Sequence, residues 1–421
     1  MFSFLLRKAG YGLLVLLGVV TVVFFLFNLT PGDPVRALVG ESASEETVQN
    51  MRRKFDLDLP IGQRFALYLN DLSPLSLHNP AVAESRIYLD PDKYSYTKLI
   101  ALSTNRALVA KWPYLKRSFK TDKNVSEILG EVIPGTVVLA VVSIALALLL
   151  GLLMGIVAAL KKDTAYDRIM LFVSALGMAG PSFFVAIIVA WLGAIVWRHE
   201  VLLPTFPLVA TVIYFSVKFY LKKRKAQVRW LNIVSLLVAC SYVVWIIVPF
   251  PYRPFEHFLH LPGTGLNMTG SLYDVDVWQG RHLSLQNMIL PVITLMVRPL
   301  SVIVQLTRSS LLDVLQQDYI RTARAKGLSE WQVVLRHALR NALNPVITAV
   351  SGWFASLLAG AVFVEFVFGW KGLGQQMFTA IEAQDLPVVM GGVIVIATAF
   401  VLINILVDVL YGWIDPRVRL G

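Results

Sequence analysis

The chain has 421 residues, of which 56% are hydrophobic and only 15% are charged, and its mean hydropathy is +0.65. A soluble domain carries about a quarter charged residues, so this composition predicts an integral membrane protein. The net charge of +11 does not indicate nucleic-acid binding, because the basic residues cluster beside apolar runs. The single cysteine, Cys240, excludes an intrachain disulfide framework and a cysteine-rich zinc site.

Apolar runs long enough to cross a membrane recur along the chain. A spanning helix needs about 20 mostly apolar residues, and charged residues mark the ends of these runs. The first run follows Arg7 and Lys8 and no A-x-A cleavage pattern comes after it, so we interpret it as an uncleaved helix rather than a signal peptide. Eight spans are predicted: Ala9–Gly32, Val132–Leu160, Ile169–Trp197, Val201–Val217, Trp230–Tyr252, His282–Thr307, Asn341–Val364 and Leu386–Val407.

The distribution of Lys and Arg predicts that both termini are cytoplasmic. Eight spans place Lys161, Lys162, the cluster Lys218–Arg229 and the terminal DPRVRL on the side of the N-terminus, and all these segments are basic. Gly369–Asp385, on the other side, is poor in basic residues. The loop Thr30–Glu131 carries basic residues, but long loops cross a membrane largely regardless of charge.

The pattern of this long loop is typical of a folded segment. Ser42 and Glu45 form a potential capping box at the start of a helix. Apolar residues then recur at helical spacing: Val48, Met51 and Phe55. Pro60 ends that helix and a second apolar segment follows, whereas Asp71–Lys111 has no clear period and is expected to be irregular.

The stretch DYIRTARAKGLSEWQVVLRHALRNALNP, Asp318–Pro345, is strongly basic and lies between two spans on the predicted cytoplasmic side. It predicts two short helices that meet at Gly327, because glycine readily adopts the left-handed conformation that ends a helix. Ser329 and Gln332 predict a capping box for the second helix.

The side chains of this stretch predict an interaction surface. An apolar stripe leads into it: Leu311, Leu315, Tyr319 and Ile320. The small residues Ala323 and Ala325 would let a partner approach closely. The second helix is expected to have one apolar face with an exposed aromatic, and its apolar residues are Trp331, Val334 and Leu335. On these residues alone, an amphipathic helix on anionic lipid headgroups and a protein-docking element are both open.

Several motifs resemble one family. DYIRTARAKGLS followed by LRHALRNALNPVIT is similar to the EAA loop of ABC importer permeases, in the oligopeptide and dipeptide (and nickel) branch. Four further segments resemble the first permease subunit of that branch: LTPGDPVRALVG, FDLDLPIGQRFALYL, VEFVFGWKGLG and VDVLYGWIDPRVRL. The resemblance covers about three quarters of the chain.

The resemblance implies an all-α polytopic helix bundle of the type I ABC importer permease kind. The residues that would couple this chain to an ATPase are Arg321, Thr322, Ala323, Arg324, Ala325, Lys326, Gly327, Leu328 and Ser329. The implied partners are a second homologous permease, two cytoplasmic ATPase subunits and an extracytoplasmic substrate-binding protein. The chain has no G-x-x-x-x-G-K-[ST] loop, so ATP and Mg²⁺ are expected on the ATPase partner, with no cofactor in this chain.

Two segments depart from the family pattern of six spans. About Asp71–Lys111 and His199–His260 look inserted, and the second supplies the fourth and fifth spans, making about eight. The expected organisation is a first transmembrane helix (1–32), an extracytoplasmic loop region (33–131), two transmembrane helices (132–198), an inserted transmembrane hairpin (199–262), and a transmembrane core (263–421) that contains the coupling loop (308–345).

Individual polar residues within the spans are candidate pathway or gate residues. Arg298 lies near mid-membrane, where arginine is costly, and it would line the substrate path or pair structurally with a partner chain. Glu365 lies near the outer end of the seventh span and is a candidate for an external gate. Asp408 is expected to form an ion pair or cap, with Arg308 as one partner. The third span is interrupted at Pro181, Ser182 and Phe183, which would open a pathway or simply kink the helix.

Glu256, His257 and His260 do not make a convincing metal site, because three residues without a wider ligand set are a weak signal. No nucleophile elbow or other catalytic constellation is present, so no catalytic residue is assigned. The sequence therefore predicts an ABC import permease subunit, multi-pass in the inner membrane of a prokaryote, with a peptide or a nickel chelate as substrate. The alternative is an ion-coupled secondary transporter or channel that would use Arg298, Glu365 and Asp408.

Overall fold

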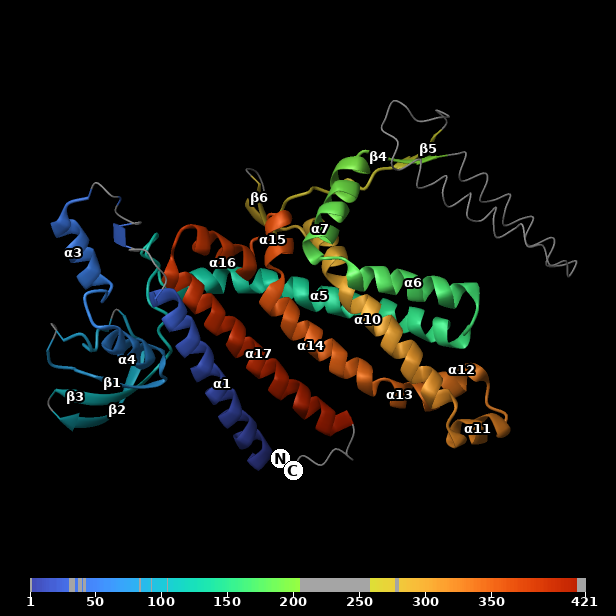
Figure 1. Cartoon of the computed structure of the whole chain (residues 1–421), viewed down its shortest axis with the longest axis horizontal. Coiled ribbons are helices and arrows are strands. Elements are labelled where there is room, and N and C mark those ends of the chain that lie inside the picture. Colours follow the sequence, from blue (N-terminus) through green and yellow to red (C-terminus); the bar gives the residue numbers. More distant parts are fainter. Residues whose placement is uncertain are drawn as a thin grey trace, which may run out of the picture. The chain divides into compact units, whose positions relative to one another are not determined.

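The computed structural model describes residues 2–29, 35–36, 40, 43–82, 85–91, 93–103, 105–204, 258–276 and 280–414. It forms two compact units, one from residues 1–185 with 270–421 and the other from residues 186–269. Long helices dominate the larger unit, and Figure 1 shows them side by side as a bundle. They are α1 (Phe2–Leu29), α5 (Val125–Leu160), α6 (Ala165–Ala179), α10 (Ile289–Leu315), α14 (Asn344–Gly360) and α17 (Leu386–Ile414).

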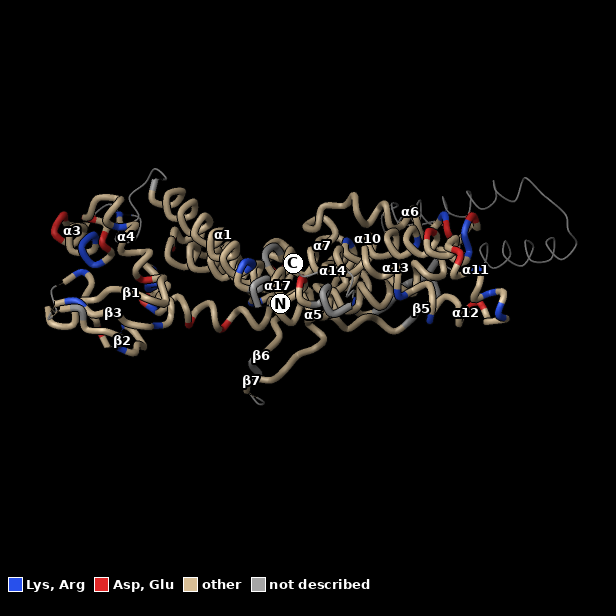
Figure 2. Tube along the Cα trace, turned by 90° about the horizontal axis from the view of Figure 1, so that it is seen from below, with Lys and Arg blue, Asp and Glu red and all other residues tan. Residues whose placement is uncertain are grey.

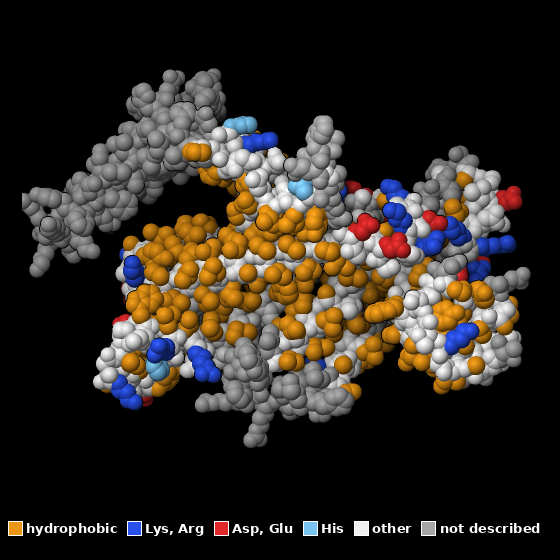
Figure 3. All heavy atoms as spheres, turned by 180° about the vertical axis from the view of Figure 1, so that it is seen from behind, with side chains coloured by type: hydrophobic (Ala, Val, Ile, Leu, Met, Phe, Trp, Pro, Cys, Tyr) orange, Lys and Arg blue, Asp and Glu red, His pale blue; other side chains and the backbone are white. Residues whose placement is uncertain are grey.

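Four helices are long and apolar enough to cross a membrane: Leu6–Asn28, Val125–Leu160, Leu285–Leu315 and Leu386–Val409. The helix pair of α6 with α7 (Ser182–Ala190) counts as a fifth if it crosses as one bent span, and α14 is a shorter apolar helix. These elements coincide with six of the eight predicted spans. The fifth predicted span and most of the fourth lie outside the described residues. Figure 3 shows hydrophobic side chains covering a broad face of this bundle, as lipid contact requires.

Glycine allows the two central helices, α5 and α10, to pack closely. A Cβ atom at Gly151 would lie 2.6 Å from Cγ2 of Ile303, and one at Gly155 would lie 2.6 Å from Cβ of Thr307. These two glycines are four residues apart and therefore lie on the same face of α5. Such spacing of small residues is a common basis of helix packing in membranes, where the hydrophobic effect gives no attraction between helices.

The C-terminal region adds two short helices between α14 and α17. These are α15 (Val362–Val367) and α16 (Leu373–Glu382). Helix α1 packs beside α17, where Gly12 faces Val401 and Lys8 Nζ lies 2.8 Å from Asp408 Oδ2. The suggested pairing of Asp408 with Arg308 is therefore wrong, because Arg308 binds Asp167 instead.

The segment between α1 and α5 folds into a first-loop subdomain, residues 43–124. It contains α3 (Glu45–Lys54), α4 (Ile61–Leu72) and an antiparallel sheet of order β1-β3-β2, with strands Leu75–His78, Arg106–Lys111 and Tyr96–Ser103. The expected irregular stretch is thus a small sheet, which the period of the sequence did not reveal. The capping prediction was also wrong in register, because Glu45 begins α3 and Ser44 caps it by accepting the Thr47 amide.

The smaller unit contains the remainder of α7, a π-helical turn η1 (Trp191–Val196), and the antiparallel pair β4 (Glu200–Pro204) and β5 (Phe258–Pro262). Thr264 Oγ1 donates to the carbonyl of Gly193 at 2.6 Å and so ties this hairpin to η1. The fourth predicted span was expected to begin at Val201, but that residue lies in β4. In the larger unit, a second hairpin, β6 (Tyr273–Asp276) and β7 (Gly280–Leu283), precedes the 3-10 turn η2 (Leu285–Met288) and α10.

Candidate functional site

The basic stretch between α10 and α14 forms a bent helix pair, residues 318–343. Its first helix is α11 (Asp318–Ala325), and its second consists of α12 (Glu330–Gln332), the π-helical turn η3 (Val333–Ala338) and α13 (Leu339–Ala342). The predicted bend is present, because Gly327 has a φ of +78°. The predicted capping box also forms: Gln332 N donates to Ser329 Oγ at 3.4 Å, and Ser329 N donates to Gln332 Oε1 at 3.1 Å.

Apolar contacts anchor the bent helix pair to the long helices. Ile320 and Ala323 are buried against Val333 and Val334, and the same cluster includes Leu311 of α10 and two residues of α5, Ile156 and Ala159. Ala323 therefore packs inward, contrary to the expectation that it faces a partner, and only Ala325 of the two alanines is exposed. The inner surface of the bent helix pair is thus packed on α5 and α10.

The predicted apolar face of the second helix is divided by the π-helical turn. Val334 is buried, whereas Trp331 and Leu335 remain exposed, because the wider turn rotates neighbouring side chains away from their α-helical positions. The exposed aromatic at Trp331 was predicted correctly. The outer surface therefore combines apolar side chains with the basic ones of α11.

Polar contacts fix the angle of the bend. Arg324 Nε and Nη2 donate to the two carboxylate oxygens of Glu330 at 2.9 and 3.2 Å, across the turn at Gly327. Asn341 Nδ2 donates to Tyr319 Oη at 2.7 Å and joins α13 to α11. Of the proposed coupling residues, Leu328 is half-buried and Ala323 is buried, while the other seven are exposed. Figure 2 shows this charged end of the bundle, with few charges along the long helices.

A bidentate ion pair stands close to the same end of the bundle. Arg308 of α10 donates through Nε and Nη2 to Asp167 of α6 at 2.5 and 2.7 Å, and the carboxylate is only 2% exposed. Thr164 caps α6 by accepting the Asp167 amide. Sequence reasoning missed Asp167, although the T-x-x-D spacing from Thr164 marks it as the fourth residue of a helix start.

Arg298 lies in α10 immediately before Pro299 and is half-buried. Its guanidinium carbon lies 5.8 Å from the ring centroid of Trp353 on α14, which is a cation–π contact. Arg298 and Trp353 thus place a cationic group beside an aromatic ring where α10 meets α14.

Glu365 holds the start of α16 in place. Its side chain is fully buried, and it accepts Thr136 Oγ1–H from α5 at 2.6 Å and the Gln375 amide at 3.1 Å. The Gly374 amide also bonds to it. Gly372 is required beside it, since a Cβ there would lie 2.4 Å from the carboxylate. Thr136 was not predicted from the sequence. Its hydroxyl oxygen accepts the Leu373 amide at 2.8 Å, so Thr136 bonds both to Glu365 and to the start of α16.

The predicted interruption of the third span is present. Helix α6 ends at Ala179 and α7 begins at Ser182, with Pro181 between them. Phe183 is exposed, and its ring centroid lies 6.4 Å from that of Phe363 on α15. The break and the helix of Glu365 are therefore neighbours, and α10, which carries Arg298, packs against both α6 and α15.

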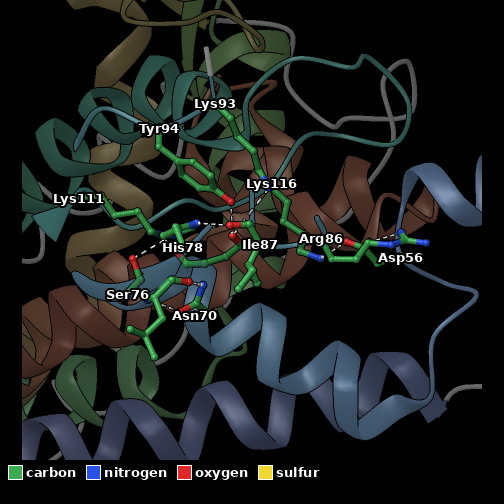
Figure 4. Close-up of polar contacts among 12 residues, drawn as sticks. Asp56, Asn70, Ser76, His78, Arg86, Ile87, Lys93, Tyr94, Lys111 and Lys116 are labelled. Carbon is green, nitrogen blue, oxygen red and sulfur yellow. Dashed lines mark hydrogen bonds and ion pairs between the residues drawn. The ribbon is translucent and has the colours of Figure 1, made fainter. Parts of the chain in front are cut away.

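A polar cluster in the first-loop subdomain centres on Asp71 of α4. Tyr94 Oη donates to Asp71 Oδ1 at 2.7 Å, Lys93 Nζ lies 3.9 Å from the same oxygen, and Lys111 donates to the Asp71 carbonyl. Figure 4 shows Lys93, Tyr94 and Lys111 gathered in this cluster, with Lys116 beside them extending toward Asp56. Burial lowers the pKa of Lys111 to about 8, and burial together with Asp71 raises the pKa of Tyr114 to about 12.

This cluster borders a cavity of about 410 Å³ between the subdomain and the ends of α1 and α17. Cationic and anionic side chains both line it, including Arg64, Lys116, Asp56 and Asp71. Lys116 Nζ lies 4.0 Å from Asp56 Oδ2, so charges of opposite sign largely balance there. Of the residues considered as metal ligands, Glu256 and His257 lie outside the described residues.

Comparison with known proteins identifies the family. Residues 151–420 match the profile of the binding-protein-dependent transport system inner membrane component, and residues 1–76 match the corresponding N-terminal profile. The chain is 28% identical over 423 residues to the dipeptide transport system permease protein DppB of Alkalihalophilus pseudofirmus, with all of both chains covered. It is 30% identical to the di/tripeptide transport system permease protein DppB of Pseudomonas aeruginosa, covering 100% of this chain and 99% of that one.

A third relative is the probable D,D-dipeptide transport system permease protein DdpB of Escherichia coli, 32% identical over 99% of this chain and 98% of that one. The similarity thus extends over the whole length, which includes the bent helix pair and the hydrogen-bonded residues around Glu365. The chain belongs to the family of inner membrane components of binding-protein-dependent transport systems.

Proposed function

We propose that this chain is one permease subunit of an ATP-driven ABC importer for peptides and forms half of the translocation pathway. The observation that carries the proposal is the bent helix pair, whose outer surface is exposed while its inner surface is packed on α5 and α10. An ATPase groove that holds the exposed side chains Tyr319, Trp331 and Leu335 would move two long helices directly. The names of the three relatives support a peptide as substrate; a nickel chelate is the alternative.

The proposed topology has both termini and the bent helix pair in the cytoplasm, and the first-loop subdomain outside. It implies two cytoplasmic ATPase subunits, a second permease that completes the pathway and an extracytoplasmic substrate-binding protein. ATP and Mg²⁺ would bind to the ATPase subunits, so this chain carries no catalytic residue and no cofactor. The proposed organisation has an extracytoplasmic loop region in 33–131, which contains the first-loop subdomain, and an inserted membrane hairpin in 199–262.

The contacts of the charged residues weaken the ion-coupled alternative. Asp408 pairs with Lys8, and all the bonds of Glu365 serve to hold α15, α16 and α5 together. Glu365 is fully buried and Asp408 is held in an ion pair, so the contacts of both carboxylates favour a structural role. Arg298 remains a candidate for binding a substrate carboxylate, and the break at Pro181–Phe183 a candidate for the pathway wall.

The decisive experiment changes the backbone at the bend without adding a clash. Nothing lies within 4 Å of a Cβ added at Gly327, so only its left-handed φ is at stake. A left-handed residue with a side chain costs about 1–2 kcal/mol, and a β-branched one more, whereas Asn tolerates that region. In the reconstituted complex, Gly327→Val should lower uptake per ATP hydrolysed, and Gly327→Asn should retain it. Wild-type coupling in the valine variant would refute the proposed role of the bend.

A separate experiment tests the inserted hairpin. The basic cluster Lys222–Lys225 is expected in the cytoplasm, so a cysteine at Ala226, in a Cys240→Ala background, should not react with an impermeant thiol reagent in intact cells. Labelling should appear only after permeabilisation. Reaction in intact cells would place the cluster outside and contradict the crossing hairpin.

A further inference from the structure

The sheet of the first-loop subdomain has an unusual distribution of polar and apolar side chains. Its inner face carries three buried polar residues, Ser76, His78 and Lys111, beside two buried apolar ones, Ala107 and Val109. Their hydrogen bonds are satisfied within the subdomain, since His78 Nε2 lies 3.1 Å from Ser76 Oγ and Nδ1 lies 3.2 Å from the Ile87 carbonyl. A sheet with one face in water normally buries apolar side chains and exposes polar ones, so three buried polar residues opposite exposed leucines are unusual.

The opposite face of the sheet is apolar and exposed. The register aligns Leu77 with Leu108 and Leu108 with Ile100, so these three side chains lie in one row across β1, β3 and β2. Leu75, Ala110 and Thr97 form the next row, and Arg106 lies at one end of this otherwise apolar face. The large residues of this face are open: Leu75 is 58% exposed, Leu77 44% and Ile100 56%. Trp112, immediately after β3, is 80% exposed, so nothing in the described part of the chain covers this apolar sheet face.

The position of α4 places the apolar sheet face next to the membrane. The apolar side of α4, which includes Phe65 and Leu69, packs on Val19, Val20 and Phe24 of α1. Val19 lies nine residues before the end of the span at Asn28, or about 14 Å of helix. Helix α4 therefore lies alongside the C-terminal part of this span, which packs on α17 at another face, rather than beyond its end.

The sheet follows α4 directly and is fastened to it. Asn70 of α4 donates through Nδ2 to the Leu77 carbonyl at 3.0 Å, and Leu77 N donates to Asn70 Oδ1 at 3.0 Å. These bonds satisfy the amide and carbonyl of Leu77 on the free edge of β1, where unpaired backbone groups would be costly near lipid. Figure 1 shows the sheet beside α4 and α1, and Figure 3 shows orange side chains on the subdomain as well as on the adjoining bundle.

From this placement we infer that the apolar sheet face is a lipid-binding surface that rests on the membrane leaflet at this end of the bundle. The occupant is the boundary between headgroups and acyl chains, where the indole of Trp112 is favourable. The strand edges exclude deeper insertion, because an open sheet edge does not occur in the hydrocarbon region. In the proposed topology this is the outer leaflet, but the inference does not depend on that orientation. The surface would fix the subdomain, and the cavity behind it, relative to the membrane.

The test measures whether lipid or water reaches the apolar sheet face. It uses the full chain within its purified complex, reconstituted in lipid nanodiscs. A nitroxide spin label is attached to Leu77→Cys, and in a second sample to Ile100→Cys, both in a Cys240→Ala background. Collisions with oxygen, which concentrates in lipid, are compared with collisions with a water-soluble nickel chelate. The matched control is Glu46→Cys on the exposed surface of α3.

We expect oxygen to dominate the collisions at residues 77 and 100 and the nickel chelate to dominate at residue 46. In parallel, brominated lipids should quench less of the tryptophan emission in Trp112→Phe than in the unsubstituted chain, a readout that needs no label. A preference for the nickel chelate at residues 77 and 100, as at the control, would show an aqueous face and overturn the inference. Shielding from both reagents would overturn it as well, since a binding protein or a second copy would then cover the face.

Discussion

Replacing Glu365 distinguishes a carboxylate that holds the helices together from one that gates the pathway. In Glu365→Ala the amides of Gln375 and Gly374 lose their acceptor at a fully buried position, and each unsatisfied buried donor costs about 1–3 kcal/mol. The loss is therefore about 2–6 kcal/mol, before any cavity term, while the hydroxyl of Thr136 can rotate to another acceptor. Glu365→Gln keeps one acceptor oxygen and should cost less, about 1–2 kcal/mol, the difference between charge-assisted and neutral bonds.

The assay is thermal unfolding of the complex in nanodiscs, with substrate uptake measured separately in sealed proteoliposomes that contain the same complex. We expect the melting temperature to fall in the order unsubstituted chain, Glu365→Gln, Glu365→Ala, with uptake falling in parallel. Gly372→Ala, which places a methyl group against the carboxylate, should behave like the alanine variant. The matched control is Glu382→Gln on the exposed last turn of α16, which should leave both measurements unchanged. Loss of uptake in Glu365→Ala with an unchanged melting temperature would refute the positioning role and favour a gate.

Three further predictions concern charged groups. Asp167→Asn breaks a buried bidentate pair with Arg308 and should lower the free energy of unfolding by about 3–5 kcal/mol. Asp408→Asn breaks a partly exposed pair with Lys8 and should change the free energy of unfolding by less than about 1 kcal/mol. Equal melting temperatures of the two variants would contradict this difference. Folding lowers the pKa of Lys111 from 10.5 to about 8, so the unfolded chain binds more protons in that range and stability should rise with pH between these values. Lys111→Met should lose that rise, and an unchanged pH profile would count against it. Arg298→Gln should reduce uptake of substrates with a free carboxylate more than uptake of neutral analogues, and equal uptake of both by a normally assembled complex would exclude a role in the path.

The sequence by itself determined the elements whose cause is local. Membrane spans depend on an uninterrupted run of apolar residues, so the existence and place of α1, α5, α10 and α17 were predicted, although their ends differ from the predicted ones by up to eight residues. The bend of the helix pair depends on one glycine and one capping box, and both formed as predicted at Gly327 and Ser329. The motifs that resemble the permease family also lie in continuous stretches, and the comparison with known relatives confirmed the family.

The tertiary structure decided everything that depends on residues far apart in the chain. Asp167 and Arg308 are 141 residues apart, and Thr136 and Glu365 are 229 apart, so no local pattern indicates that either pair meets. The small side chain of Ala323 was expected to face a partner, but Val333 and Val334 of η3 pack against it. The sheet of the first-loop subdomain escaped prediction because both of its faces mix polar and apolar residues: Lys111 and Val109 are buried on one face, while Leu77 and Arg106 lie on the other. The period of a strand shows only that two faces differ, and packing against Leu89 and Tyr94 decides which of them is buried.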